Sequence, residues 1–256
     1  MTRDFGRTEV DAARLGKLPD GATASSLLRS ESDVQAPGQG WTFFVNGVRP
    51  ETRADEYELA PGDRVQWDRR GPGAPARVRA IVGAFPGPFR YGLNGERRPV
   101  RVECDDAESD PCRDAKQTLE SVDVSASGSS LGAPGTEHVT RLVVARWPRA
   151  RIVRGGSTLE EGPRSSGVFV RFSEDGGALE LLDDNGDVAR TVHPGDGIAL
   201  VAALRPRADE LLWLVTSLDQ RALAAGVRAL REDKLRDAFA VAVTGRTVEK
   251  LPLEPR

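Results

Sequence analysis

Histidine, cysteine and methionine are scarce in this sequence, and each scarcity narrows the chemistry available to the protein. The 256 residues include two histidines, two cysteines and one methionine. His138 and His193 both lie in turn-forming sequence, so a Ser-His-Asp or Cys-His arrangement has little to be built from. Two cysteines are fewer ligands than a structural zinc site uses, and we expect no metal site.

Long apolar runs are also missing. No stretch approaches the roughly 18–20 consecutive apolar residues that a transmembrane helix needs, so we expect no membrane span in this chain. The first residues lack the charged and apolar regions of a secretion signal. No phosphate loop or dinucleotide-binding glycine pattern is present, so we expect neither a nucleotide nor another cofactor.

Charge of one sign does not dominate. The 36 basic and 39 acidic residues leave a net charge of −3, which gives no long-range attraction to phosphates, and we expect no nucleic-acid partner. Nearly all basic residues are arginines, which a GC-rich genome explains more simply than selection for guanidinium recognition. Five arginines between positions 141 and 154 are expected on a solvated face.

The two cysteines lie close together, at Cys104 and Cys112, with an acidic, turn-rich loop between them. We predict a disulfide that closes this short loop, with metal binding and two free thiols as the alternatives. A disulfide is typical of an oxidising compartment. We therefore expect an extracellular or cell-envelope protein, exported by a signal segment that is absent from this chain.

A stretch rich in Gly, Ser, Ala and Pro divides the chain. Residues 125–138 contain no apolar periodicity, and we predict a linker there between units at 1–124 and 139–256. We expect an α+β protein: an N-terminal β-grasp-like domain with one short helix, then a mixed α/β domain that ends in a strand–helix–strand unit.

Helix-capping residues and alternating apolar residues predict the helix and strands of the N-terminal unit. Asp20 or Thr23 can cap a short helix that includes Leu27 and Leu28. Residues 41–45 alternate as a strand, with Phe43 and Phe44 on opposite faces, and end in the turn signal Asn46-Gly47. Residues 65–67 predict a second half-buried strand.

The C-terminal unit contains a second hairpin and then a change of pattern. Asn185-Gly186 separates strands at 179–182 and 188–192, and this turn is favoured over a calcium loop. Residues 211–216 are nearly all apolar, as in a strand that is covered on both faces. A helix and a strand at 239–243 follow.

Aromatic residues of the first unit are the candidate ligand site. The segment from Phe85 to Tyr91 combines three aromatic rings with Pro and Gly, which is typical of an exposed binding loop. The equally weighted alternative is that these rings hold the loop on the sheet. The predicted ligand-binding residues are Phe44, Asn46, Tyr57, Phe85, Phe89, Arg90 and Tyr91, with Asn46 and Arg90 as polar anchors.

Three segments of the first unit resemble a known family: Gly21–Ala24, Trp41–Gly47 and Pro61–Asp68. They are similar to the small C-terminal domain of transcobalamin and intrinsic factor, and to related bacterial secreted domains of unknown function. The resemblance covers about residues 1–104. It implies a β-grasp-like sheet with one helix and, in the animal proteins, one half of a corrinoid-binding clamp.

Three functions are therefore compared. We expect an exported or cell-envelope protein that binds a small molecule or an envelope partner without catalysis. The first alternative is capture of a corrinoid, together with a separate helical domain or an uptake transporter. The second is an envelope carbohydrate-related enzyme, which would need two carboxylates of opposed titration behaviour in one cleft.

Overall fold

The computed structural model describes residues 1–31, 40–71, 77–93 and 95–255. Its helices are α1 (Ala24–Glu31), α2 (Gly87–Arg90), α3 (Asp110–Glu120), α4 (Trp147–Ala150), η1 (Gly156–Glu160), α5 (Pro163–Ser166), α6 (Gln220–Arg228) and α7 (Glu232–Leu235). Its strands are β1 (Thr2–Arg3), β2 (Thr8–Glu9), β3 (Trp41–Val45), β4 (Val65–Arg69), β5 (Val100–Cys104), β6 (Ala126–Ser130), β7 (Thr140–Arg146), β8 (Val170–Phe172), β9 (Leu179–Leu182), β10 (Val188–Val192), β11 (Ile198–Leu204), β12 (Leu211–Ser217), β13 (Ala240–Thr244) and β14 (Thr247–Leu251). The predicted α+β class is confirmed.

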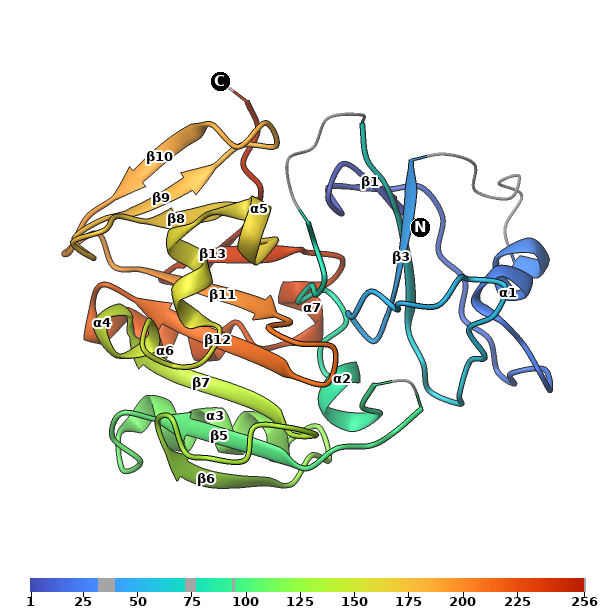
Figure 1. Cartoon of the computed structure of the whole chain (residues 1–256), viewed down its shortest axis with the longest axis horizontal. Coiled ribbons are helices and arrows are strands. Elements are labelled where there is room, and N and C mark those ends of the chain that lie inside the picture. Colours follow the sequence, from blue (N-terminus) through green and yellow to red (C-terminus); the bar gives the residue numbers. More distant parts are fainter. Residues whose placement is uncertain (32–39, 72–76, 94, 256) are drawn as a thin grey trace.

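A seven-stranded mixed sheet forms the larger part of the molecule, on the left in Figure 1. Its strand order is β14-β13-β11-β12-β7-β5-β6. The four strands β6, β5, β7 and β12 are parallel, whereas β11 runs antiparallel to both of its neighbours. The predicted strand–helix–strand unit is β12, α6 and β13, and β11 lies between its two strands.

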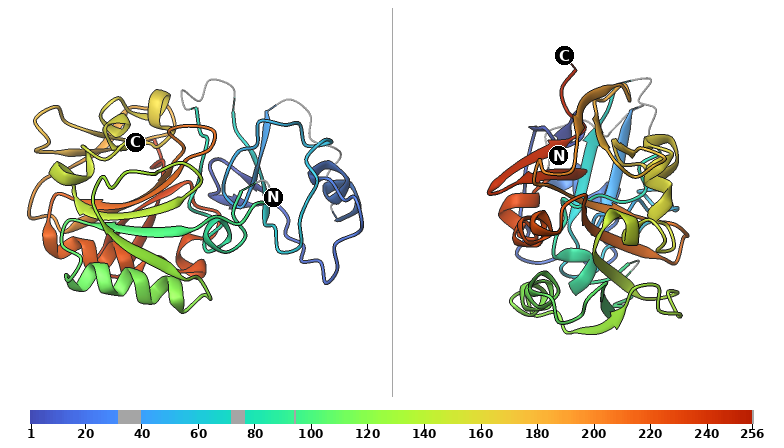
Figure 2. Two further views of the ribbon diagram at one scale, coloured as in Figure 1. Left: turned by 60° about the horizontal axis from the view of Figure 1, so that its bottom comes forward. Right: turned by 90° about the vertical axis from the view of Figure 1, so that its left-hand side faces the viewer.

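Both faces of this sheet are covered. Along β12, Trp213 and Val215 face one hydrophobic cluster and Leu214 faces the other, as the continuous apolar run predicts. Helices α3 and α6 lie together on the first face, as the left view of Figure 2 shows. The three-stranded antiparallel sheet β10-β9-β8 lies over the second face, where Phe172 stacks on Trp147 with ring centroids 3.6 Å apart.

The predicted linker at 125–138 requires correction. Residues 126–130 form β6, which pairs in parallel with β5, so the sheet contains segments from both sides of that stretch. Small residues such as Gly128 and Ser129 carry no apolar pattern, but an exposed edge strand is held by its backbone hydrogen bonds. Because α3 connects β5 to β6, residues 100–130 form a compact β-α-β unit within the large sheet.

The N-terminal segment forms a separate four-stranded sheet of order β2-β1-β4-β3, on the right in Figure 1. Helix α1 begins as predicted, because the Oγ1 of Thr23 accepts a hydrogen bond from the backbone N–H of Ser26 at 3.1 Å. Phe43 and Phe44 point to opposite faces of β3, also as predicted. Phe43 stacks on Trp67 at 5.1 Å, whereas Phe44 turns toward the rest of the protein.

An aromatic seam joins the two sheets. We use this name for one cluster of buried side chains: Phe5, Phe44, Val78, Ile81, Phe169, Leu182 and Phe239. Phe239 makes edge-to-face contacts with Phe44 at 5.6 Å and with Phe5 at 5.3 Å. Burial of each ring stabilises the folded state by about 1.5–3 kcal/mol, so the seam contributes strongly to the docking of the N-terminal sheet.

Polar contacts centred on Asp237 reinforce the seam. Its carboxylate pairs with Arg64 at 3.2 Å, and its carbonyl oxygen accepts a hydrogen bond from Gln66 at 3.1 Å. Gly6 has a φ of 76°, and a Cβ at this position would lie 1.7 Å from the carbonyl oxygen of Asp237. The N-terminal turn therefore approaches residue 237 as closely as only glycine permits.

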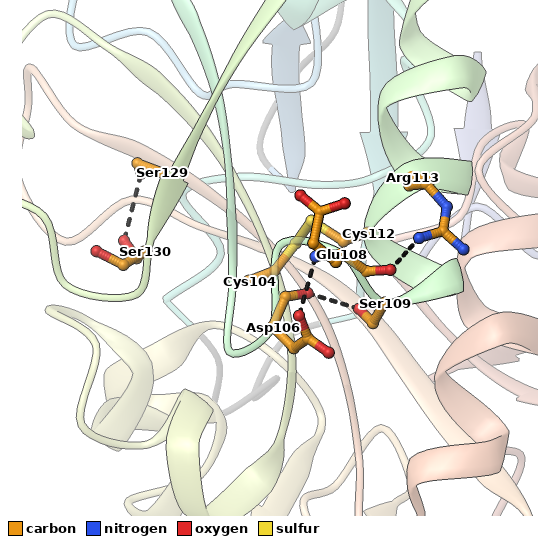
Figure 3. The surroundings of a disulfide bond; sticks show 8 residues. All are labelled: Cys104, Asp106, Glu108, Ser109, Cys112, Arg113, Ser129 and Ser130. Carbon is orange, nitrogen blue, oxygen red and sulfur yellow. Dashed lines mark hydrogen bonds between the residues drawn. A yellow bond between two sulfur atoms is a disulfide. The ribbon is translucent and has the colours of Figure 1, made fainter.

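The predicted disulfide between Cys104 and Cys112 is confirmed. It joins the end of β5 to the first turn of α3, and both half-cystines are buried (Figure 3). Within the closed loop, Ser109 donates a hydrogen bond to the carbonyl oxygen of Asp106 at 2.7 Å. By the chain-entropy model, closure of so short a loop stabilises the fold by about 2.5 kcal/mol.

We predict that Phe239→Ala lowers the free energy of unfolding by about 3–5 kcal/mol, because it leaves a cavity among Phe5, Phe44 and Phe169. Urea denaturation followed by circular dichroism measures the change. Ile152→Ala is the control, since that side chain is 67% exposed and its loss should cost less than about 0.5 kcal/mol. Equal effects of the two substitutions would contradict the role of the seam.

Candidate functional site

The segment from Phe85 to Tyr91 is not the exposed loop that its Pro and Gly residues predicted. Phe85 and Phe89 are each 1% exposed, and their rings lie 5.9 and 5.0 Å from the indole of Trp213. The segment also forms a regular helical turn, α2. The two phenylalanines are thus core residues, as the alternative interpretation held, because their rings cover the helical face of the large sheet.

Two further predicted contact residues are buried elsewhere. Phe44 is completely buried in the aromatic seam, where Phe5 and Phe239 cover it rather than the 85–91 segment. Tyr57 is 7% exposed and lies on the other face of β3, with its ring 6.3 Å from that of Phe43. These two rings therefore share no surface on which one ligand can lie.

The predicted polar anchors have structural partners. Asn46 is 2% exposed, donates to the carboxylate of Asp63 at 2.7 Å and accepts from the backbone N–H of Arg64 at 3.0 Å. Arg90 pairs with Asp123 at 3.0 Å and lies over the ring of Tyr91 at 5.8 Å. Asn46 thus fixes the turn before β4, whereas Arg90 remains partly exposed.

A hollow does exist beside this segment, and Phe89 is one of its walls. We call it the Arg98 hollow; it has a volume of about 320 Å³, at the lower end of ligand-pocket sizes. Its lining residues are Phe89, Arg97, Arg98, Pro99, Val100, Val124 and Ser125. They come from α2 and from the chain just before β5 and β6, so the hollow lies where these two parallel strands begin.

Arg98 is the most constrained charge in the hollow. Its side chain is 6% exposed, and one guanidinium nitrogen donates to the carbonyl oxygen of Asp209 at 2.5 Å. The nearest carboxylate is that of Glu96 at 3.8 Å, and it is 62% exposed. The Nε atom of Arg98 has no hydrogen-bond partner among the described residues. The positive charge is therefore fixed in place but only weakly neutralised.

Other arginines add to the positive field behind Arg98. Burial lowers the pKa of Arg205, and the nearby charges of Arg79 and Arg98 lower it further, against the opposing carboxylate of Glu51. Arg97, in contrast, is an exposed side chain of the lining. The hollow is thus lined by one buried and one exposed arginine, a residue type that suits an acceptor-rich or negatively charged group.

Of the residues that line the hollow, Phe89 is the one that the sequence predicted as a ligand contact. The adjacent arginines Arg97 and Arg98 before Pro99 are the available signal for the others. This signal is weak because nearly all basic residues of the chain are arginines. Val124 is the last residue of the expected first unit and Ser125 the first of the expected linker, and only the parallel pairing of β5 with β6 brings them next to Arg98.

A second hollow, of about 440 Å³, lies between the N-terminal turn and the end of β14. Its charges are mixed in sign and mostly paired. Arg7 pairs with Asp184 at 3.3 Å, and Arg190 pairs with Glu249. Lys250 donates to the carbonyl oxygen of Gly6 at 2.8 Å. These contacts tie the two ends of the chain together, which is a structural role.

Two buried carboxylates have displaced pKa values in opposite directions. Burial raises the pKa of Asp68, although Thr2 and the N–H of Gly6 donate hydrogen bonds to it. Burial alone would also raise the pKa of Glu103, but hydrogen bonds and charges from Arg141 and Arg101 lower it. Asp68 lies on β4 and Glu103 on β5, so the two belong to different sheets, and both side chains are fully buried.

Glu103 and Arg141 form a buried ion pair. Two parallel hydrogen bonds of 2.7 and 2.8 Å join them, and Arg101 adds a third at 3.0 Å. The expectation that the arginines at 141–154 mark a solvated face is therefore wrong for Arg141, which is 1% exposed. Glu103 lies on β5 and Arg141 on β7, so this ion pair could not be identified from periodicity alone.

Comparison with known proteins gives one family match. Residues 26–70 match a family described as a domain of unknown function (DUF4430). This range includes β3 and β4 and both later segments that carry the transcobalamin resemblance. No curated protein matches the chain.

Within the ranges that the structure describes, no group of His, Cys, Asp or Glu side chains is arranged to hold a metal ion. In the same ranges, no helix has the length and apolar character needed to cross a membrane.

We predict that Glu103→Gln lowers the free energy of unfolding by about 3–5 kcal/mol at neutral pH, because it leaves Arg141 buried without a charged partner. A carboxylate with a lowered pKa stabilises the fold above its unfolded pKa, and this stability is lost as the pH falls through the folded pKa. The difference from the wild type should therefore shrink below about pH 4.

Asp105→Asn is the matched control for that substitution. Asp105 pairs with Arg149 at 2.8 Å, but both side chains are more than 40% exposed, so its loss should cost less than about 1 kcal/mol. Urea titrations at several pH values compare the two variants. A pH-independent loss in Glu103→Gln would show that the charge pair is not the cause.

Proposed function

We propose that this protein is a non-catalytic binding protein of an oxidising, extracytoplasmic compartment, and that it holds a small molecule in the Arg98 hollow. The observation that carries the proposal is the nearly buried guanidinium of Arg98, fixed by Asp209 in a hollow of about 320 Å³ with apolar walls. Such a combination of apolar lining and few oriented polar groups is typical of small-molecule sites.

The disulfide supports the compartment. Cys104 and Cys112 are the only cysteines, and a structural disulfide between them is typical of exported proteins rather than of the reducing cytoplasm. The family match at residues 26–70 is to a domain of unknown function, which agrees with the coarser part of the resemblance. We extend it to a relationship with the C-terminal domain of transcobalamin, on the residues at 41–47 and 61–68.

The two alternative functions gain less support. A corrinoid is much larger than the Arg98 hollow, so its capture would require a partner protein to supply most of the binding surface. A glycosidase needs two carboxylates that flank one bond. Asp68 and Glu103 are the buried carboxylates with displaced pKa values, and each is held by internal partners in a different sheet.

We expect alkylation of thiols in a denaturing lysate of the source organism, prepared without reductant, to leave both Cys104 and Cys112 unmodified, because the disulfide forms in an oxidising compartment. Mass spectrometry after denaturation measures the modification. Reduction before alkylation is the control and should label both residues. Two labelled cysteines in the unreduced lysate would contradict the proposed compartment.

A binding screen tests the site. The purified chain is screened against small molecules by protein-observed NMR, and we expect ligands to shift the signals of Val124 and Ser125. Ser125→Trp places an indole at the exposed mouth of the hollow and should weaken binding of such a ligand at least about tenfold. Ser121→Trp, at the exposed end of α3, is the matched control and should leave affinity unchanged. Equal binding by both variants would reject the hollow as the site.

A further inference from the structure

We propose that the ligand of the Arg98 hollow is a small organic anion, with a carboxylate or phosphoryl group carried on an apolar body of about one ring. This inference rests on the proposed function and specifies its ligand. Both chemical groups present several acceptor oxygens to a guanidinium, and two arginines line the hollow.

The charged residues that line the hollow are all of one sign. Among the described residues that line the hollow, Arg97 and Arg98 are cationic and none is acidic. The second hollow is mixed in sign, since Glu249 and Glu254 share its lining with three cations. A one-signed lining creates a local positive potential that raises the concentration and affinity of an anion.

The side chain of Arg98 is largely removed from water. Its side chain is 6% exposed, so water solvates the charge poorly, and its Nε has no hydrogen-bond partner among the described residues. The contacts to the carbonyl oxygen of Asp209 and to the exposed Glu96 neutralise it incompletely. An anion in the hollow would offset this uncompensated charge in a medium of low dielectric constant, where the interaction is strong.

Much of the wall of the hollow is apolar. Phe89, Val100 and Val124 are buried residues of the core, and Pro99 is exposed at the rim. Ser125 is an exposed residue of the lining. A body of about one ring fits a volume of about 320 Å³, whereas a bare inorganic anion would leave the apolar wall uncovered.

Three probes of similar size separate charge from shape: benzoate, phenyl phosphate and the neutral benzyl alcohol. NMR titration of the full chain follows the amides of Val124 and Ser125, and those of Ala189 and Leu253 report on the second hollow. We expect benzoate, phenyl phosphate or both to shift the first pair, with benzyl alcohol inactive and the second pair unmoved. The stronger of the two anions identifies the anionic group.

Variants assign the charge. Arg97→Gln should weaken the active anion at least about fivefold, and Arg97→Lys should retain part of the affinity, because it keeps the charge but loses the planar fork. Arg98→Lys should weaken it as well. Arg113→Gln, at an exposed position of α3, is the control and should bind as the wild type does. Thermal denaturation verifies that each variant is folded.

The failures of the two proposals are distinguishable. Equal shifts from benzyl alcohol and the anions would overturn the anionic ligand while leaving the hollow as a binding site. Unchanged affinity in Arg97→Gln and Arg98→Lys would overturn it in the same way. If no probe shifts the signals of Val124 and Ser125, the proposal of an anionic ligand is also overturned. If a ligand from the screen binds elsewhere on the protein, the proposed function is overturned.

Discussion

The contact between Phe239 and the rings of Phe5 and Phe44 is the constraint on which the rest of the structure depends. It fixes the four-stranded sheet against the large sheet and thereby fixes the chain that passes between them. That connecting chain begins in the seam, where the N–H of Val82 donates to the carbonyl oxygen of Phe239 at 3.2 Å. It then runs through α2 to Arg98 and β5. The seam therefore fixes the start of the chain segment that leads to the Arg98 hollow, although no residue of the seam lines the hollow.

Features with a local cause could be predicted from the sequence. The cap at Thr23, the turn at Asn185-Gly186 and the disulfide each depend on residues a few positions apart, so their chemistry is visible in the sequence. Strand β12 could also be predicted, because its continuous apolar run indicates burial on both faces. Alternation in β3 also gave the correct faces for its two phenylalanines, but it could not identify what covers each face.

Features with a non-local cause could not be predicted. Phe44 is covered by residues 5 and 239, which lie near opposite ends of the chain, and no periodicity encodes such a contact. Residues 126–130 have the composition of a linker, yet they complete a β-α-β unit because the edge of β5 was available for pairing. The candidate site was missed for the same reason. Phe89 and Arg98 belong to neighbouring segments, whereas Ser125 reaches them only through that strand pairing.

Two buried arginines of this fold differ in how their charge is neutralised, and the difference distinguishes a structural arginine from one at the candidate site. Arg141 is buried with two hydrogen bonds from its guanidinium to Glu103, so its desolvation is offset within the chain. Arg98 is nearly as buried, but its close partner is a neutral carbonyl group and its nearest carboxylate lies at 3.8 Å in an exposed position. A charge that the chain buries and neutralises only in part raises the free energy of the unliganded state. An anion from outside removes that cost, and burial of Arg98 then contributes to binding.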